Sequence, residues 1–329
     1  MLDTVSPRAG VEFMSSRATN GKQFLALRVL LTEDCNLACV FCHNEGQAGL
    51  AMRSALDVGT FRLLINAAVG RNLRQIKFSG GEPTLHPDLT DLVRISTDLG
   101  LDTAVISNGL DLETLRKQTL LGARTCLNIP SANPDTYHGL TGGRLGTVIC
   151  TLASLRDAGS NVSINSYAGL APNLRQITGL LTLATAYSCD LKLLLPCQVI
   201  SAESQQRSRV AYGRMLQALG CRHTLDTPYD SRWRTHEGSS VRVVQPWCPR
   251  ACKAVAGYYK SLRLAANMRL LPCFDGSALS VPVDFTCEDS CGRSLDTALA
   301  LTATGCGDVA GVKVLRRTIG RANGERRAH

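Results

Sequence analysis

Apolar and polar residues follow two different periods from residue 24 onward. Short runs rich in Leu and β-branched residues have the length of buried strands, and the longer segments between them repeat apolar residues at helical spacing. Strands are predicted at 24–32, 75–79, 102–107, 125–130, 161–167 and 190–196. Helices are predicted at 58–70, 88–99, 111–120, 143–158, 173–187 and 203–219. This alternation favours an α/β fold with a parallel sheet, and we expect a partial (β/α)6 TIM-type barrel because the units are fewer than in a closed barrel.

The alternation ends near residue 220, and the rest of the chain has a different character. Residues 221–247 are polar and arginine-rich and contain Pro228, Gly238 and Pro246, so a linker is predicted there. Residues 248–329 contain further cysteines and end in a basic tail, which suggests a small C-terminal domain. The expected division is an N-terminal extension at 1–23, the barrel at 24–220, the linker, and the C-terminal domain.

Composition and hydropathy exclude several classes of protein. Of the 329 residues, 44% are hydrophobic and 19% are charged, which is enough apolar content for a large core and argues against a disordered chain. The most apolar stretch, Gly179–Ile200, is interrupted by Asp190 and Lys192, so no membrane span is expected. The N-terminus lacks the apolar segment of a secretory signal. We therefore expect a cytoplasmic protein with no membrane partner.

The positive charge is unevenly distributed. Lys and Arg total 36 against 27 Asp and Glu, a net charge of +9, and the excess lies after residue 150. Such a distribution favours an anionic small-molecule substrate, although an arginine-rich composition alone would also produce it. Only 5% of the residues are aromatic, too few for the stacking surfaces that nucleic-acid binding needs, so no nucleic-acid partner is expected.

Three of the 14 cysteines lie within one short segment directly after the first predicted strand. Cys35, Cys39 and Cys42 have the spacing C-x3-C-x2-C, which places three thiolates around one metal centre. An iron–sulfur cluster held by three cysteines leaves one iron open to another ligand. The alternatives are a zinc site that uses His43 as a fourth ligand, and buried structural cysteines.

Other cysteines and polar residues have simpler interpretations. His43, Asn44 and Glu45 follow the cysteine segment and could contact substrate or cap the next helix. Five cysteines lie in apolar runs and are expected to be core residues: Cys126, Cys150, Cys189, Cys197 and Cys221.

A second motif, SGGEP at residues 79–83, follows the second predicted strand. Its glycines allow a ligand or another backbone segment to approach closely. With CNLACVFC, it resembles the radical S-adenosylmethionine (SAM) superfamily. The resemblance implies a 4Fe–4S cluster on Cys35, Cys39 and Cys42 that binds SAM, and a low-potential donor such as flavodoxin or ferredoxin. It also implies that SAM is contacted by residues on the cysteine segment and at the strand ends: Phe41, Gly80, Gly81, Glu82, Ser107, Asn108 and Asn128.

Further segments resemble the GTP 3′,8-cyclase family of molybdenum cofactor synthesis, over roughly residues 24–275. These are ANPDTYHGLTGG, VSINSYAGLAPN, LKLLLPC and SLRLAANMRLLPCF. The resemblance implies a second 4Fe–4S cluster on Cys248, Cys252 and Cys273, with Cys287 or Cys291 as a further candidate ligand. The spacing is longer than in that family, and a zinc site on the same cysteines is the alternative.

The resemblance also bears on the substrate. Arg28, Lys77 and Arg263 match positions where the family places basic residues on its nucleotide. Ser163 and Ser261 replace a lysine and an arginine of the family, and each loss removes a charge-assisted contact to phosphate. We therefore expect Arg28, Lys77, Ser163 and Arg263 to bind an anionic nucleotide or nucleoside other than GTP.

The expected activity is hydrogen abstraction by a 5′-deoxyadenosyl radical, followed by formation or rearrangement of a carbon bond. This would be a lyase, cyclase or transferase reaction, in a pathway resembling nucleoside antibiotic biosynthesis. Three alternatives stay open: GTP 3′,8-cyclase itself, a peptide-modifying radical SAM enzyme with a SPASM-type domain, and a metal-binding scaffold without catalysis.

Overall fold

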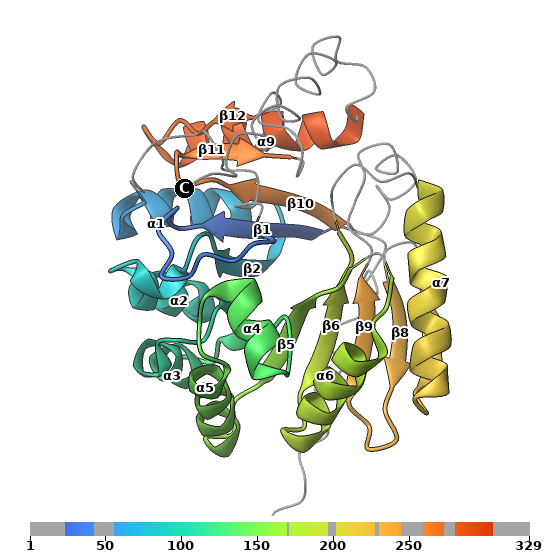
Figure 1. The fold of residues 1–329 in the computed structure, drawn as a ribbon. Coiled ribbons are helices and arrows are strands. Elements are labelled where there is room, and N and C mark those ends of the chain that lie inside the picture. Colours follow the sequence, from blue (N-terminus) through green and yellow to red (C-terminus); the bar gives the residue numbers. More distant parts are fainter. Residues whose placement is uncertain are drawn as a thin grey trace, which may run out of the picture.

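Helices lie outside a strongly curved sheet in the computed structural model of this protein (Figure 1). The structure describes residues 24–42, 56–169, 171–196, 202–227, 230–244, 259–272 and 280–304. The strands form a single sheet of order β12-β11-β10-β1-β2-β3-β4-β5-β6-β9-β8-β7, whose two ends are not paired with each other in this part of the chain. The predicted α/β fold and partial barrel are therefore confirmed.

All the strands predicted from the hydrophobic pattern are present. They are β1 (Phe24–Leu30), β2 (Leu73–Ser79), β3 (Asp102–Ser107), β4 (Arg124–Asn128), β5 (Val162–Tyr167) and β6 (Asp190–Leu194). Each pairs in parallel with the next. The carboxyl ends of these strands therefore meet at one edge of the sheet, where sites in barrels of this type are built.

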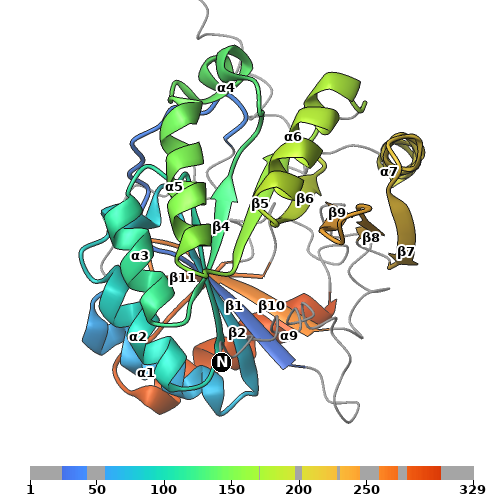
Figure 2. The same ribbon diagram turned by 90° about the horizontal axis from the view of Figure 1, so that it is seen from below.

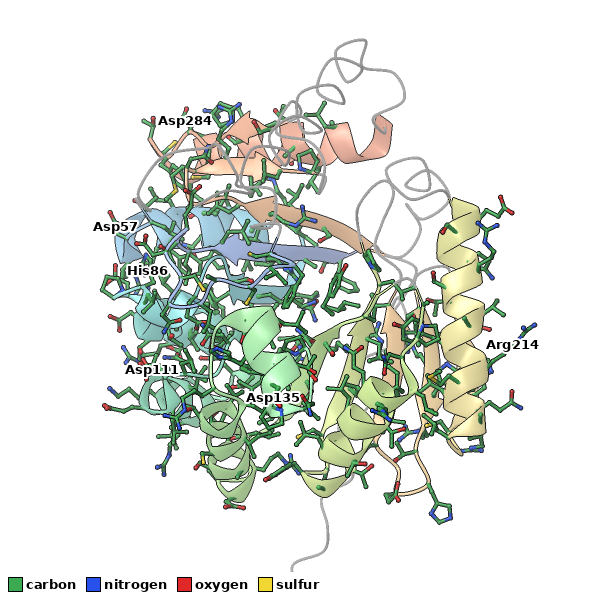
Figure 3. All side chains as sticks on the ribbon, viewed as in Figure 1. Asp57, His86, Asp111, Asp135, Arg214 and Asp284 are labelled. Carbon is green, nitrogen blue, oxygen red and sulfur yellow. The ribbon has the colours of Figure 1, made fainter. Side chains whose placement is uncertain are left out.

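The predicted helices are present as well, and they cover the outer face of the sheet (Figure 2). They are α1 (Val58–Val69), α2 (Leu89–Asp98), α3 (Leu112–Leu120), α5 (Leu145–Asp157), α6 (Leu174–Ala186) and α7 (Ala202–Ala218). Asp57 and Asp111 cap α1 and α3 by accepting backbone N–H bonds from Thr60 and Thr114 (Figure 3). The apolar face of the sheet packs with these helices into one continuous core.

Besides the longer helix α9 (Glu288–Thr304), two short helices were not predicted. They are α4 (Pro134–Thr141) and the 3₁₀ helix η3 (Pro83–Leu85). Each begins with proline in its first turn, where the missing N–H costs nothing. Both are too short to produce a clear helical period, which explains why the hydrophobic pattern does not reveal them.

The predicted linker at 221–247 is wrong. Its described residues form β7 (Arg222–Asp226), β8 (Asp230–Arg234) and β9 (Ser240–Val244), with β9 parallel to β6 and β8 antiparallel to β9. One face of β8 presents Trp233 to Gly213 of α7, and its other face carries charged residues. Charged residues at alternate positions gave the segment the composition of a loop although its backbone pairs as strand.

The boundary predicted at residue 248 is not a break in the sheet. Strand β10 (Tyr259–Leu264) pairs in parallel with β1, and β11 (Arg269–Leu271) and β12 (Val281–Pro282) continue that edge. Arg71, in the turn after α1, donates two bonds of 2.7 Å to the carboxylate of Asp296 in helix α9 (Glu288–Thr304). The predicted extension at 1–23 and the end of the basic tail lie outside the described residues.

Hydropathy adds one observation about the helices. Among the described residues, none of the helices combines the length and the apolar character that crossing a membrane requires.

Candidate functional site

The candidate site lies at the carboxyl ends of β1 to β5. The cysteine loop, residues 31–42, follows β1, and the glycine turn, residues 80–82, follows β2. Ser107 and Asn108 end β3, and Asn128 ends β4. The residues for which the sequence implied SAM contact therefore lie at the carboxyl ends of neighbouring strands.

The glycine turn packs directly on the backbone of the cysteine loop. The N–H of Gly81 donates to the carbonyl of Thr32 at 2.6 Å, and the N–H of Glu82 donates to the carbonyl of Asp34 at 2.8 Å. A Cβ atom on Gly81 would lie 2.1 Å from the Asp34 carbonyl oxygen. Gly80 has a φ of +131°, and a Cβ there would lie 2.6 Å from the Thr32 oxygen. Both glycines are required because two backbone segments meet here.

Glu82 joins the ends of β2 and β3. Its side chain is 1% exposed and accepts bonds of 2.8 Å from the hydroxyls of Thr84 and Ser107 and from the Asn108 N–H. Burial raises the pKa of this carboxyl, and the hydrogen-bond donors oppose that change. The contacts give Glu82 the role of ordering the turn.

Asn108 connects the end of β3 with the cysteine loop. Its amide nitrogen donates to Oδ1 of Asn36 at 2.7 Å and lies 4.0 Å from Sγ of Cys35. Its own Oδ1 accepts the N–H of Leu110. Asn36 was not predicted as a site residue, because an asparagine between two cysteines has no distinctive spacing.

The cysteine loop is also held from the opposite side, by α4. The N–H groups of Ala38 and Val40 donate to the carbonyls of Thr141 and Leu140 at the end of that helix. The aromatic ring of Phe41 stacks on Tyr167 at the end of β5, with ring centroids 5.1 Å apart and planes 4° apart. The loop is thus fixed against three different parts of the barrel, and Tyr167 is a site residue that the sequence analysis did not identify.

The three thiols share this loop and influence one another. Cys39 is half-buried, and desolvation followed by the nearby Cys42 and Cys35 raises its pKa to about 11. Among the described residues, no three His, Cys, Asp or Glu side chains converge on a single metal ion. Three thiolates on one short loop fit a 4Fe–4S cluster, because each cysteine there binds a different iron.

Six residues that the sequence singles out lie outside the described residues: His43, Asn44, Glu45, Cys248, Cys252 and Cys273. Cys287 is exposed at the start of α9, and Cys291 is buried in the core against α1. Burial raises the pKa of the Cys291 thiol, as is usual for a structural cysteine. A role of either residue in a second cluster stays a prediction.

The predicted substrate cations are brought side by side. Arg28 on β1 is paired in register with Lys77 on β2 and with Arg263 on β10. Residues in register on neighbouring parallel strands share a face of the sheet, and here the face is the barrel interior. Burial, followed by the charges of Arg28 and Lys192, lowers the pKa of Lys77 to about 7. Several basic side chains thus approach one another in the interior.

Cys126 is buried, as expected, but its sulfur contacts polar groups of this interior. Ser163 Oγ donates to its sulfur at 3.1 Å, and Lys192 Nζ lies 3.9 Å away. Burial favours the neutral thiol, but the charge of Lys192, the hydrogen bond from the Ser163 hydroxyl and the charges of other cations lower the pKa of Cys126 below its ordinary value. Ser163 is thus placed in the interior as predicted, in contact with a thiol.

The remaining cysteines in apolar runs behave differently from one another. Cys189 and Cys221 are buried in the core, as expected. The prediction for Cys150 is wrong, because this residue is exposed on the outer side of α5. Cys197 lies outside the described residues.

Comparison with known proteins adds to this geometry. Residues 29–184 match the radical SAM superfamily. The probable GTP 3′,8-cyclase of Thermococcus kodakarensis is 32% identical over 124 residues, which cover 37% of this chain and 40% of the relative. The GTP 3′,8-cyclase of Pseudomonas savastanoi pv. phaseolicola is 26% identical over 263 residues, 75% of this chain and 78% of the relative. The match to the Thermococcus relative thus spans well under two thirds of that protein.

Solved structures share the fold at low sequence identity. SuiB of Streptococcus suis bound to the precursor peptide SuiA has a TM-score of 0.59 at 15% identity, covering 77% of this chain and 60% of that chain. His-tagged anSMEcpe with bound AdoMet has a TM-score of 0.57 at 11% identity, covering 85% and 79%. Both similarities concern the fold.

Proposed function

From the radical SAM domain at residues 29–184, we propose that this protein is an enzyme that uses SAM to abstract hydrogen from an anionic nucleotide or nucleoside. A 4Fe–4S cluster on Cys35, Cys39 and Cys42 would supply the electron that cleaves SAM to a 5′-deoxyadenosyl radical. The substrate then forms or rearranges a carbon bond, as in nucleoside antibiotic biosynthesis. The reducing partner is a low-potential protein of the flavodoxin or ferredoxin type.

Other parts of the chain hold the cysteine loop, face the bound SAM and exclude water. The glycine turn and α4 fix the cysteine loop, so the three thiols keep their positions when a cluster binds. Ser107, Asn108 and Asn128 present polar groups at the carboxyl edge, where SAM would lie. The interior below that edge excludes bulk water and places the substrate near the radical.

The observation that carries the substrate class is the register of Arg28, Lys77 and Arg263. It places three basic side chains side by side on one face of the sheet. A phosphate-bearing ligand offers the acceptor oxygens that guanidinium groups bind best, so it suits this face.

The decisive experiment measures 5′-deoxyadenosine release by anaerobically reconstituted, reduced protein. The reactions contain SAM alone, or SAM with purine nucleotides, pyrimidine nucleotides, nucleosides or short peptides. Stimulation by a nucleotide or nucleoside other than GTP supports the proposal. Stimulation by peptides alone contradicts it and favours the peptide-modifying alternative, and no release under any condition contradicts SAM chemistry itself.

GTP 3′,8-cyclase is a second candidate, favoured by the match to the Pseudomonas relative over 75% of this chain. Strong stimulation by GTP, with formation of a cyclised product, would replace the proposal by this activity. Ser163 argues against it, because a serine bound to Cys126 replaces a cation on the nucleotide side of the interior.

We also propose the second 4Fe–4S cluster, on Cys248, Cys252 and Cys273. The variant Cys35→Ala/Cys39→Ala/Cys42→Ala is expected to retain about four irons per chain after reconstitution, because a cluster needs about three thiolates of its own. Iron and acid-labile sulfide are measured together with the visible absorption. The matched variant at Cys248, Cys252 and Cys273 should also retain about half of the wild-type iron. Loss of all iron from the first variant would contradict a second cluster.

The low pKa of Lys77 predicts that nucleotide binding depends on pH. The side chain loses its charge as the pH rises through about 7, so the affinity for an anionic nucleotide should fall several-fold between about pH 6 and pH 8.5. Calorimetric titration at each pH measures this change. Lys77→Arg should flatten the profile because arginine stays charged, and Cys126→Ser separates the contribution of the neighbouring thiol. A profile of Lys77→Arg identical to that of the wild type would contradict the assignment.

A further inference from the structure

A row of polar residues crosses strands β4, β5, β6, β9 and β8. Asn128 on β4 is paired in register with Asn165 on β5, and Asn165 is paired with Lys192 on β6. Lys192 is paired with Arg242 on β9, and Arg242 with Arg232 on β8. Because paired residues share a face, the row runs from the proposed SAM-contacting Asn128 to two arginines in the segment expected to be a linker.

The row faces the barrel interior. Lys192 lies 3.9 Å from the buried sulfur of Cys126, and its charge contributes to the low pKa of Lys77 on β2. The row therefore borders the same space as the cations on β1, β2 and β10, but from strands further along the sheet. A ligand in this space would meet positive charge from both groups of strands.

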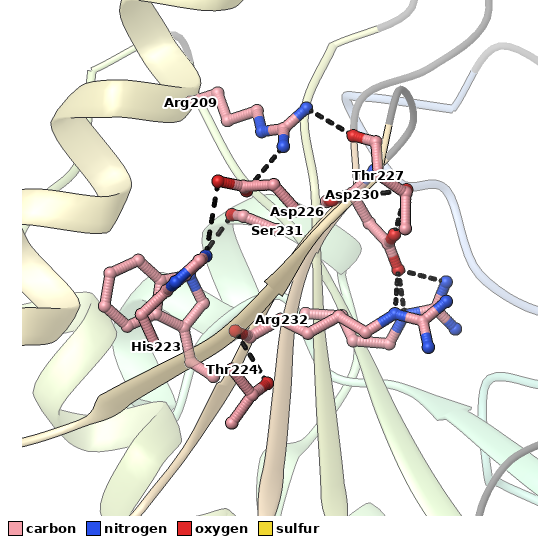
Figure 4. Close-up of polar contacts among 10 residues, drawn as sticks. Arg209, His223, Thr224, Asp226, Thr227, Asp230, Ser231 and Arg232 are labelled. Atoms are coloured by element: carbon pink, nitrogen blue, oxygen red, sulfur yellow. Dashed lines mark hydrogen bonds and ion pairs between the residues drawn. The ribbon is translucent and has the colours of Figure 1, made fainter. Parts of the chain in front are cut away.

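Arg242 is held in place by a buried carboxylate. Asp230 is 1% exposed and binds both Arg242 and Arg232, and Thr227 donates to it as well (Figure 4). Burial works against ionisation of Asp230, but Arg242 and its other partners outweigh burial and lower its pKa. One carboxylate faces two guanidinium groups, and Lys192 lies beside them. The Arg242 side chain is still 19% exposed, so a ligand can reach it.

A second, independent feature lies in the same row. Asn165 is 8% exposed, and its Oδ1 has no hydrogen-bond partner within the described chain. A buried acceptor without a donor costs free energy, so this atom needs a donor that the described chain does not supply. A hydroxyl or N–H of a ligand would be such a donor, next to Lys192 and Arg242 in the same row.

We propose that Lys192 and Arg242 bind a phosphate group of the substrate while Asn165 accepts a hydrogen bond from an adjacent hydroxyl or N–H of the same molecule. Asp230 is a positioning residue that aims Arg242. This inference rests on the proposed function and adds a specificity-determining subsite, formed partly by β9, which lies outside the region that matches the radical SAM superfamily. Cations on two groups of strands suit a substrate with both a phosphate and further polar groups, such as a nucleoside diphosphate or a sugar nucleotide.

The test uses reconstituted protein with SAM and calorimetric titration of GTP, UTP, UDP-glucose, uridine and inorganic pyrophosphate. Arg242→Gln and Lys192→Met should each weaken the tightest phosphate-bearing ligand about tenfold or more, and leave uridine within about twofold. Arg242→Lys keeps a cation beside Asp230 and should recover part of the affinity if folding is not the cause. Arg234→Gln removes an exposed arginine of the same hairpin, bonded to the Gly238 carbonyl, and should behave like the wild type.

The outcomes separate this inference from the proposed function. If nucleotides bind and Arg28→Gln weakens them while Arg242→Gln and Lys192→Met do not, the subsite is wrong and the proposed function stands. If nucleotides do not bind but pyrophosphate binds and depends on Arg242, the subsite stands and the proposed substrate class is wrong. If neither binds to the wild type, the subsite is overturned. If pyrophosphate binds to every variant with equal affinity, the attraction is non-specific and the proposed subsite is also overturned.

Discussion

Replacing Gly81 by alanine is expected to lower 5′-deoxyadenosine formation by about 100-fold. A Cβ atom at this position would lie 2.1 Å from the Asp34 carbonyl oxygen and 2.7 Å from the Glu33 oxygen. Both neighbours are backbone atoms, so relief requires moving the cysteine loop itself. Displacements of this kind cost about 2–3 kcal/mol or more, and each 1.4 kcal/mol corresponds to about tenfold in rate or binding.

Reconstituted iron content, SAM affinity and 5′-deoxyadenosine release measure this effect. Iron should fall together with activity, because the displaced loop carries Cys35, Cys39 and Cys42. Gly146→Ala is the matched control, since a Cβ atom there meets nothing within 4 Å and alanine favours the helix. Wild-type iron content and activity in Gly81→Ala would show that the close backbone contact is not needed to hold the loop.

Replacing Glu82 by alanine is expected to produce the largest loss of stability among the site residues. The carboxylate accepts bonds from two hydroxyls and two backbone N–H groups, of Thr84, Ser107 and Asn108. Its removal leaves buried donors without an acceptor, which costs about 1–3 kcal/mol for each group that water cannot reach. We expect a loss of about 3 kcal/mol in the free energy of unfolding, and a decrease of about 5 °C or more in the melting temperature.

Anaerobic thermal unfolding of the reconstituted protein measures the change. Glu113→Ala is the control, because Glu113 is exposed and its ion pair with Lys117 across one helical turn contributes only about 0.5 kcal/mol. SAM cleavage should decrease more than stability alone accounts for, since Asn108 contacts both Glu82 and the cysteine loop. A melting temperature equal to that of Glu113→Ala would contradict the role of Glu82 as the joint between β2 and β3.

Together these two residues explain why the motif at 79–83 accompanies the cysteine spacing. The glycines allow the backbone of the turn to meet the backbone of the cysteine loop, and the glutamate fixes that turn to the next strand. In this structure the motif shapes the site through contacts within the chain. Polar groups left at the carboxyl edge, such as Asn128, are then available to a ligand.

The sequence alone determined the part of the fold that depends on local periodicity. Strands 102–107 and 161–167 and helix 58–70 were predicted within about a residue, because their residues face a core on one side and satisfy one period throughout. The cysteine spacing and the paired glycines are also local features of the sequence, so they predict the cysteine loop without any knowledge of how the strands pair.

Tertiary structure decided the features that depend on which strands become neighbours. Strand β8 has charged residues at alternate positions and β9 carries Arg242, and only the pairing of β9 with β6 and of β8 with β9 shows that Arg242 and Arg232 share a face with Lys192. Cys126 lies in an apolar run, yet register places it beside Ser163 and Lys192. Arg263 reaches Arg28 across more than 200 residues of sequence through the pairing of β10 with β1. Sequence periodicity fixes which face a residue takes on its own strand, whereas the partner across the sheet is set by long-range pairing that no local pattern encodes.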